Sequence, residues 1–394
     1  MIASEVRALF AVASRPEIVS LAGGMPAVDA LPMEAVAATV AEVVTRRGAQ
    51  ALQYGSAQGD PDLRARICDV MALEGITDAH PDSVVVTAGS QQALDLLTRV
   101  FVDPGDVVLT EGPTYVTAIN TFAAYQARIV HVPMDDDGLV PDGLAQMLRR
   151  LAAEGARVKL LYTVPTFQNP GGITLTAQRR AEVVEICRRA GVLVVEDNPY
   201  GLLSFTGEPG RAIRADAPDD VVYLGSFSKT LAPGMRVGWA LAPPAVTARL
   251  VLAAESAILS QSMFTQLSVE HYLATQPWAE QLKGLRELYR ERRDAMLDAL
   301  AASMPVGARW TRPDGGFFVW LTLPGGVDTK AMLPRAIAAR VAYVPGVGFY
   351  ADGSGRSSMR LSYCYPPAER VRDGVERLAQ VITAELRLRD TFRS

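Results

Sequence analysis

One lysine lies among residues that could carry covalent chemistry. The chain has only four lysines, and Lys229 closes the run Ser226-Phe227-Ser228-Lys229. Two hydroxyls beside this amine, followed by Pro233-Gly234-Met235-Arg236, could hold a phosphate while the lysine forms a Schiff base with an aldehyde. The alternative is that Lys229 is a solvated surface lysine, which is the commonest environment of this side chain.

Asp197 could supply the second half of that chemistry. It follows the apolar run Gly191–Val195 and precedes Asn198-Pro199-Tyr200. A buried carboxylate there could keep a pyridinium nitrogen protonated, which makes the ring of an aldehyde cofactor an electron sink. A helix cap or a structural ion pair is the alternative. A further loop, Gly89-Ser90-Gln91, could open a helix whose N–H groups bind phosphate, although the tripeptide alone is a weak signal.

Short apolar runs predict the strands that must position these residues. Near-continuous apolar runs suit strands that are buried on both faces of a parallel sheet. Helix-length segments separate most of them, which predicts an α/β sheet with right-handed crossovers. The predicted strands are Ser83–Thr87, Asp106–Thr110, Arg128–Val132, Lys159–Val164, Gly191–Val195 and Val221–Leu224. The predicted helices between them are Gln91–Val102, Tyr115–Tyr125, Pro141–Glu154 and Ala177–Arg189.

Polar loops follow five of the predicted strands. They cover residues 88–92, 111–115, 165–170, 196–200 and 225–229. Open α/β sheets bind ligands outside the carboxyl ends of their strands, so we expect these loops to converge on one site. Each loop taken singly could be an ordinary turn, but five together favour a common site.

The C-terminal part of the chain predicts a second unit. A helical stretch from about Val246 to Ala302 leads into it. Its predicted elements are a strand at Gly316–Leu323, a helix at Lys330–Arg340, a strand at Met359–Tyr363 and a closing helix at Pro367–Arg387. We therefore predict three parts: an N-terminal segment (1–45) that contributes to the small domain and the mouth of the site, a large α/β domain (46–285) and a small α+β domain (286–394).

Composition excludes several classes of function. The chain has 394 residues and a net charge of −4, so it lacks the basic field that favours nucleic acid or an acidic membrane. No apolar run approaches the roughly 20 residues of a membrane span. Neither the three histidines nor the three cysteines have metal-ligand spacing, so we expect no metal. The separated cysteines are typical of reduced thiols and favour a cytoplasmic location.

Four motifs carry a resemblance to a known family: SFSKTLAPGMRVGW, VPTFQNPGG, VVEDNPYG and YVPGVGFY followed by MRLSY. The chain resembles fold-type-I pyridoxal-phosphate enzymes, in particular the aspartate-aminotransferase-like class I/II aminotransferases. It is most similar to the subgroup of 2-aminoadipate, kynurenine and aromatic or branched-chain aminotransferases. The resemblance runs from about Ser4 to the final helix. It implies a large domain with a mostly parallel sheet flanked by helices, a smaller α+β domain, and pyridoxal 5′-phosphate as cofactor.

The resemblance also implies a reaction. An amino group would move between an L-α-amino acid and a 2-oxo acid through internal aldimine, external aldimine, quinonoid and ketimine, with the aminated cofactor as carrier. Lys229 would form the internal aldimine and move the Cα proton, and Asp197 would pair with the pyridine nitrogen. Asn169 and Tyr200 would bind the phenolic oxygen, and Tyr115 would stack on the ring.

The remaining implied contacts concern the phosphate and the substrate carboxylate. Arg360 would clamp the α-carboxylate with help from Gly24 and Asn169, because a guanidinium binds a carboxylate bidentately. Tyr54 of the partner subunit would reach the phosphate, which implies a homodimer with shared active sites. On sequence alone, Tyr54 and Tyr115 could also be ordinary half-buried tyrosines. The phosphate would be bound by Ser90, Gln91, Ser226, Ser228 and Arg236.

Three points stay open at this stage. Arg7 could meet a distal carboxylate of the substrate, or it could be a solvated arginine on an exposed helix. Gly171 in NPGG departs from the Thr or Ala that is usual there. A pyridoxal-phosphate oxidase, cyclase or lyase of secondary metabolism would use the same scaffold. A regulator with an aminotransferase-like half would need an N-terminal winged helix, for which the resemblance from Ser4 leaves no room.

Overall fold

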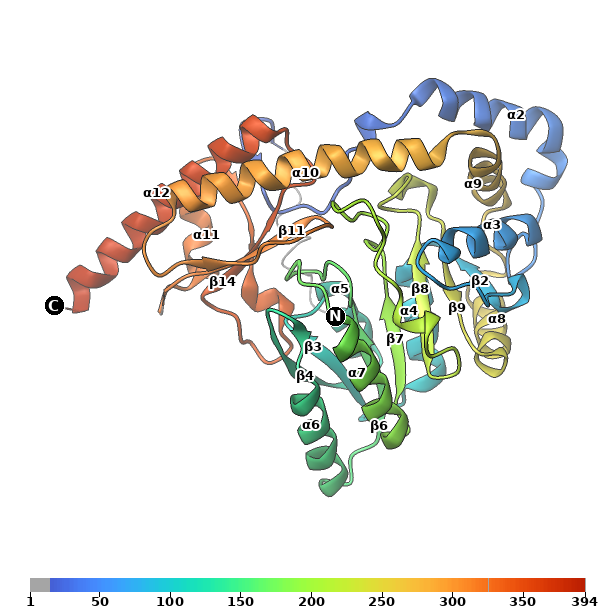
Figure 1. The fold of residues 1–394 in the computed structure, drawn as a ribbon, viewed down its shortest axis with the longest axis horizontal. Helices are drawn as coiled ribbons and strands as arrows, with labels where there is room; N and C mark the ends of the chain where they lie inside the picture. Colours follow the sequence, from blue (N-terminus) through green and yellow to red (C-terminus); the bar gives the residue numbers. More distant parts are fainter. Residues whose placement is uncertain (1–14, 325, 394) are drawn as a thin grey trace.

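A mostly parallel eight-stranded sheet lies at the centre of the computed structural model, which describes residues 15–324 and 326–393 (Figure 1). The strand order is β2-β9-β8-β7-β6-β3-β4-β5. The strands β9 and β5 run antiparallel to their neighbours, and the remaining neighbours pair in parallel. The bounds are β2 (Val84–Thr87), β3 (Val107–Gly112), β4 (Arg128–Asp135), β5 (Gly138–Leu139), β6 (Val158–Thr163), β7 (Leu193–Asp197), β8 (Val221–Ser226) and β9 (Gly238–Leu241). This arrangement confirms the predicted α/β fold class.

Helices bury both faces of this sheet. Val107 and Leu109 of β3 pack with residues of α6 and α7, whereas Val108 packs with residues of α4 and α5. Successive side chains of a strand point to opposite faces, so an unbroken apolar run is what a sheet covered on both sides requires. The helices of this part are α2 (Met33–Ala51), α3 (Pro61–Ala72), α4 (Ser90–Phe101), α5 (Val116–Ala124), α6 (Pro141–Ala153), α7 (Ala177–Ala190), α8 (Pro244–Ile258) and α9 (Met263–Thr275).

Local sequence signals set several helix ends. The Asp60 side chain accepts hydrogen bonds from the N–H groups of Asp62 and Leu63, and Pro61 occupies the first turn of α3. Gly191 adopts a left-handed conformation at the end of α7, where its N–H bonds the carbonyls of the last turn.

A second part contains an antiparallel sheet of order β10-β11-β14-β13. Its strands are β10 (Arg309–Trp310), β11 (Phe318–Thr322), β13 (Val344–Pro345) and β14 (Ser358–Ser362), and its helices are α11 (Thr329–Ala338) and α12 (Ala368–Arg393). Near the N-terminus, β1 (Val19–Ser20) pairs in parallel with β12 (Val341–Ala342). The long helix α10 (Trp278–Ser303) extends from beside α9 to α12, against which it packs (Figure 1). The N-terminal segment thus joins residues from the C-terminal part.

The structure also differs from the predicted elements. The helical stretch after Val246 is three helices, because Leu259 has a positive φ and Pro277 precedes α10. The short strand β9 and the helices α2 and α3 were not predicted. The predicted domain boundaries fall inside α2 and α10, and the division into those units stays a prediction. Among the described residues, no helix combines the length and the apolar character that crossing a bilayer needs.

Candidate active site

A cavity of about 410 Å³ opens where the five polar loops meet. Each of the five loops contributes lining residues, and Gly24 and Arg360 reach the cavity from the N- and C-terminal parts. Tyr54 does not line the cavity: its side chain is 77% exposed in this chain. Arg7 lies outside the residues that the structure describes. The predicted site residues that line the cavity are Gly24, Ser90, Gln91, Tyr115, Asn169, Asp197, Tyr200, Ser226, Ser228, Lys229, Arg236 and Arg360.

The amine of Lys229 is placed inside this cavity. Its Nζ donates a hydrogen bond to the carbonyl of Gly24 at 2.9 Å. Burial lowers the pKa of Lys229, the charges of Arg360 and Arg236 add to that effect, and the Cys364 thiol and the carboxylate of Asp197 oppose it. A lowered pKa increases the neutral fraction of an amine, and the neutral amine is the nucleophile.

The carboxyl group of Asp197 is only half satisfied by the protein. The hydroxyl of Tyr162 donates a hydrogen bond to Oδ2 at 2.7 Å. Oδ1 is buried and has no hydrogen-bond partner among the described residues. Burial raises the pKa of Asp197 to about 6, while the Tyr162 hydrogen bond, the Lys229 charge and the nearby Ser90 hydroxyl counteract it. A buried acceptor without a partner is costly, so this oxygen calls for a donor on a ligand in the cavity.

A further group of residues that line the cavity suits an anion. The helix α4 begins at Ser90, directly after Gly89, whose φ is +79°. The hydroxyl of Ser226 donates to that of Ser228 at 2.9 Å, and Arg236 Nη2 donates to the Ala88 carbonyl at 2.6 Å. A Cβ at position 89 would lie 2.5 Å from Arg236 Nη2, so glycine is needed for this close approach. A helix N-terminus, two hydroxyls and a guanidinium together suit a phosphate.

Arg360 provides a further cation in the lining of the cavity. Its Nη1 donates to Asn169 Oδ1 at 2.9 Å, and its Nη2 donates to the Ala22 carbonyl at 2.7 Å. The guanidinium carbon lies 4.1 Å from the centre of the Phe318 ring. Nε is buried and has no partner among the described residues. Burial lowers the pKa of Arg360 to about 10, so the group stays charged at neutral pH and can bind a carboxylate.

Hydrogen bonds from Gln168, a residue that the sequence analysis did not single out, hold the loop that carries Asn169. Gln168 Nε2 donates to Glu111 Oε2 at 3.0 Å and to the carbonyl of Pro113 at 2.7 Å. Gln168 Oε1 accepts from the N–H of Gly171 at 2.7 Å. A Cβ at position 171 would lie 2.8 Å from that same oxygen, which gives a physical reason for glycine at this place.

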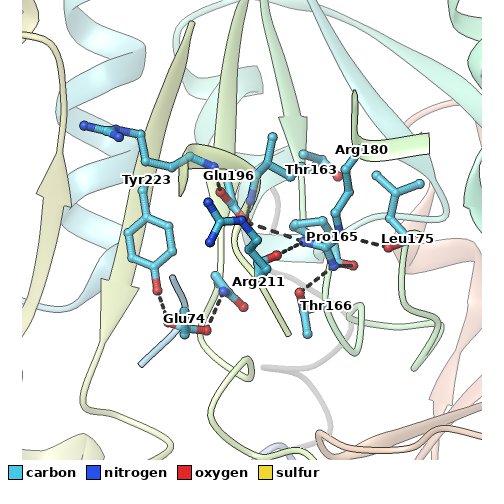
Figure 2. A network of polar contacts seen from close by, with 12 residues as sticks. Glu74, Thr163, Pro165, Thr166, Leu175, Arg180, Glu196, Arg211 and Tyr223 are labelled. Atoms are coloured by element: carbon cyan, nitrogen blue, oxygen red, sulfur yellow. Dashed lines mark hydrogen bonds and ion pairs between the residues drawn. The ribbon is translucent and has the colours of Figure 1, made fainter. Parts of the chain in front are cut away.

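A row of buried polar side chains lies behind the site, on the face of the sheet that α7 covers (Figure 2). Glu196 of β7 is paired in register with Thr163 of β6 and Tyr223 of β8. Since successive side chains alternate, Glu196 points away from the face that Asp197 uses. Arg180 of α7 approaches Glu196 to 3.9 Å and donates to carbonyls of the loop after β6, at Pro165 and Leu175. These contacts join the ends of β6, β7 and β8, from which the loops of the site begin.

Glu74 lies at one end of this row, and no described Lys or Arg forms an ion pair with it. Its carboxyl group accepts hydrogen bonds from Tyr223 Oη at 2.5 Å and from Asn198 Nδ2 at 2.8 Å. A Cβ at position 201 would clash with Glu74 Oε1, so Gly201 makes room for it. Burial raises the pKa of Glu74 to about 8. The only sequence signal for these residues is a charged or hydroxylated side chain inside an apolar run, which predicts no partner.

Comparisons with known proteins agree on one family. The family model described as "Aminotransferase class I and II" matches residues 16–378. The chain is 43% identical to aromatic-amino-acid aminotransferase 1 of Thermococcus litoralis, over 98% of this chain and 93% of that protein. Its fold matches Pyrococcus horikoshii kynurenine aminotransferase, solved with PMP, at a TM-score of 0.93 and 40% identity, covering 98% and 96% of the two chains. The Thermus thermophilus α-aminoadipate aminotransferase, complexed with N-(5′-phosphopyridoxyl)-L-leucine, gives 0.90 and 37%, with the same coverage.

Proposed function

Because the chain belongs to the family of class I and II aminotransferases, and is therefore an enzyme that transfers amino groups between amino acids and 2-oxo acids, we propose that its cavity binds pyridoxal 5′-phosphate through Lys229. Enzymes of this family depend on that cofactor. The observation that carries the proposal is the unpaired Oδ1 of Asp197, which shares one cavity with the Lys229 amine and the anion site at α4.

The residues present fit the chemical groups of this cofactor. A protonated pyridine nitrogen is the donor that Asp197 Oδ1 lacks. The phosphate fits the N-terminus of α4 with Ser90, Gln91, Ser226, Ser228 and Arg236 around it. Asn169 and Tyr200 line the same cavity and would bind the phenolic oxygen, while Tyr115 would stack on the ring. When bound, the cofactor supplies an electron sink for the bonds at the substrate Cα.

The substrate would be oriented by Arg360 and Asn169. Phe318 packs on the guanidinium, and the Nη1 bond to Asn169 fixes the plane in which it presents its donors. If the Arg360 guanidinium binds the substrate carboxylate, the Cα–H bond of the substrate would point toward Lys229. Lys229 Nζ would accept that proton, because its lowered pKa keeps a neutral fraction of the amine available.

We also propose a homodimer in which Tyr54 of the partner subunit completes the phosphate site. Large apolar side chains near Tyr54 and on α2 are exposed in the single chain, with Leu52 78% and Met33 53% exposed. Apolar surface of this kind is covered when two copies pair about a twofold axis. A cytoplasmic location, which the three free cysteines support, completes the proposal.

Borohydride reduction followed by peptide mapping tests the covalent anchor. In the presence of the cofactor, reduction should attach the pyridoxyl group to the peptide that contains Lys229. Lys229→Ala should abolish turnover and covalent labelling while retaining cofactor that is bound without a covalent bond. Lys283→Ala, which removes an exposed lysine of α10, is the matched control and should behave as the unmodified enzyme. Labelling at another lysine, or ordinary turnover by Lys229→Ala, would overturn the assignment.

A further inference from the structure

Tyr162 contacts the proposed cofactor counter-ion and has no role assigned so far. It is fully buried, and it lies in β6 next to the strand that ends at Asp197. Its ring packs edge-on against Phe122 of α5, with 5.7 Å between the ring centres. Its hydroxyl donates to Asp197 Oδ2 at 2.7 Å, and the residue lines the same cavity.

The register of the sheet fixes this contact. Tyr162 is paired with Val195, and Asp197 stands two residues further along the same strand. Residues two apart in a strand share a face, so both side chains lie on the cavity side of the sheet. A tyrosine that leans along its strand spans the offset between the two positions. With Phe122 against its ring, the hydroxyl is held in place by backbone pairing and packing.

The contact also makes the two carboxylate oxygens of Asp197 unequal. Oδ2 accepts from Tyr162, which leaves Oδ1 as the buried oxygen that no described residue meets within hydrogen-bond geometry. Building on the proposed function, we propose that Tyr162 is a positioning residue whose hydroxyl orients the Asp197 carboxylate and keeps it anionic, so that Oδ1 faces the pyridine nitrogen.

This hydrogen bond affects the protonation state of Asp197. Burial raises the pKa of Asp197, and the Tyr162 hydroxyl is the largest influence that opposes this rise, ahead of the Lys229 charge and the Ser90 hydroxyl. Tyr115 and Tyr200 also face the carboxylate and stay neutral, because burial raises the pKa of both phenols. Without the hydroxyl, a larger fraction of Asp197 would be protonated at neutral pH, and the ring nitrogen would lose part of its counter-ion.

The test compares two cofactors in two tyrosine variants. Tyr162→Phe removes only the hydroxyl. Tyr343→Phe is the matched control, since Tyr343 is equally buried but donates to the Thr329 carbonyl in the C-terminal part. The apo form of each protein is titrated with pyridoxal 5′-phosphate and with the 1-deaza analogue, in which carbon replaces the ring nitrogen. The absorbance of the bound cofactor is then followed against pH.

Tyr162→Phe should weaken binding of pyridoxal 5′-phosphate by about tenfold to a hundredfold, the usual effect of losing one hydrogen bond to a charged group. It should leave affinity for the deaza analogue unchanged, because that analogue offers Asp197 no N–H. The pH at which the cofactor spectrum changes should also move, and it should not move in Tyr343→Phe. We expect kcat to fall while KM for the amino acid stays near that of the unmodified enzyme.

Each other outcome has a definite meaning. Equal loss of affinity for both cofactors, or no loss for either, would overturn the role of Tyr162. An apo form of Tyr162→Phe that unfolds where Tyr343→Phe folds would assign the hydroxyl to folding and would also overturn it. If the unmodified enzyme prefers pyridoxal 5′-phosphate over the analogue and Tyr162→Phe keeps that preference, the proposed function stands and this inference fails. If the unmodified enzyme binds neither cofactor, the proposed function itself fails.

Discussion

Replacing Glu74 by glutamine should change how the stability of the protein depends on pH. Glu74 is buried, its carboxyl group accepts hydrogen bonds from Tyr223 and Asn198, and no ion pair joins it among the described residues. Burial raises its pKa from 4.5 to about 8. Between these two values the folded protein holds a proton on Glu74 that the unfolded chain has released. Folding therefore takes up a proton, and stability falls as pH rises through this window.

The size of the effect follows from the same two values. One proton taken up on folding gives a slope of about 1.4 kcal/mol per pH unit, and the difference between 4.5 and about 8 caps the loss near ~5 kcal/mol. Glutamine has the same shape and carries no charge at any pH. If the Asn198 amide turns over, the glutamine amide can donate to Asn198 Oδ1, which has no hydrogen-bond partner among the described residues. As pH rises, the free energy of unfolding of Glu74→Gln should therefore increase relative to that of the unmodified protein. Near pH 9 the variant should be the more stable of the two.

Urea unfolding of the apo forms at several pH values between 5 and 9 measures this directly. The quantity to compare is the difference in unfolding free energy between variant and unmodified protein. Burial also raises the pKa of Glu111 and Glu196, and both residues remain in each protein. The charge of Glu196 adds to the raised pKa of Glu74, so its effect on Glu74 is part of the measured difference. Glu291→Gln, which changes an exposed residue of α10, should give a constant difference. A constant difference for Glu74→Gln as well would refute the reasoning, because it would mean that folding takes up no proton at Glu74.

Three further outcomes test the site. Arg360→Lys should lower kcat/KM for α-amino acids by about a hundredfold or more, because a bidentate charged contact is lost. It should leave the reaction with an amine that lacks the carboxylate unchanged, and steady-state kinetics with both substrates measure the two effects. Arg236→Gln should weaken cofactor binding by about tenfold to a hundredfold in an equilibrium titration, and unchanged affinity would remove Arg236 from the phosphate site. Gln168→Leu should raise KM for the amino acid by roughly tenfold at nearly constant kcat, because the Asn169 loop loses its ties to Glu111 and Pro113; a fall in kcat alone would contradict this.

The sequence was informative where chemistry and local pattern coincide. The strands before Ser90, Asn169, Asp197 and Lys229 were predicted close to their observed bounds, because a strand covered on both faces must be an unbroken apolar run. The same topology places the loops after those strands at one edge of the sheet, which is why residues from all five loops line one cavity. What each of these residues does there stays a prediction until the experiments above are made.

The sequence was uninformative where a contact depends on distant partners. Tyr162 is one more apolar residue in the run before Asn169, and only the register of β6 on β7 brings it to Asp197. Glu74 lies in the turn just after α3 and meets Tyr223 across 149 positions of sequence. The strand β9 was missed because four residues, Gly-Trp-Ala-Leu, form too short a run to predict a strand by itself. Contacts between buried residues that are far apart in the chain leave no periodic pattern in a single sequence.

The segment Ala22–Met25 has a consequence for the order in which the enzyme becomes competent during synthesis. Its carbonyl groups accept hydrogen bonds from Lys229, Arg360 and Cys364, so residues separated by up to 341 positions of sequence meet in this one short stretch. The ribosome releases the whole central sheet, up to Leu241, well before Arg360 emerges. A nascent chain can therefore pair all strands of the central sheet while Arg360 is still missing from the cavity, although the largest apolar core also needs later residues such as Tyr363 and Val371. Chains interrupted shortly before Arg360 would therefore lack both the guanidinium that binds the carboxylate and the C-terminal share of that core.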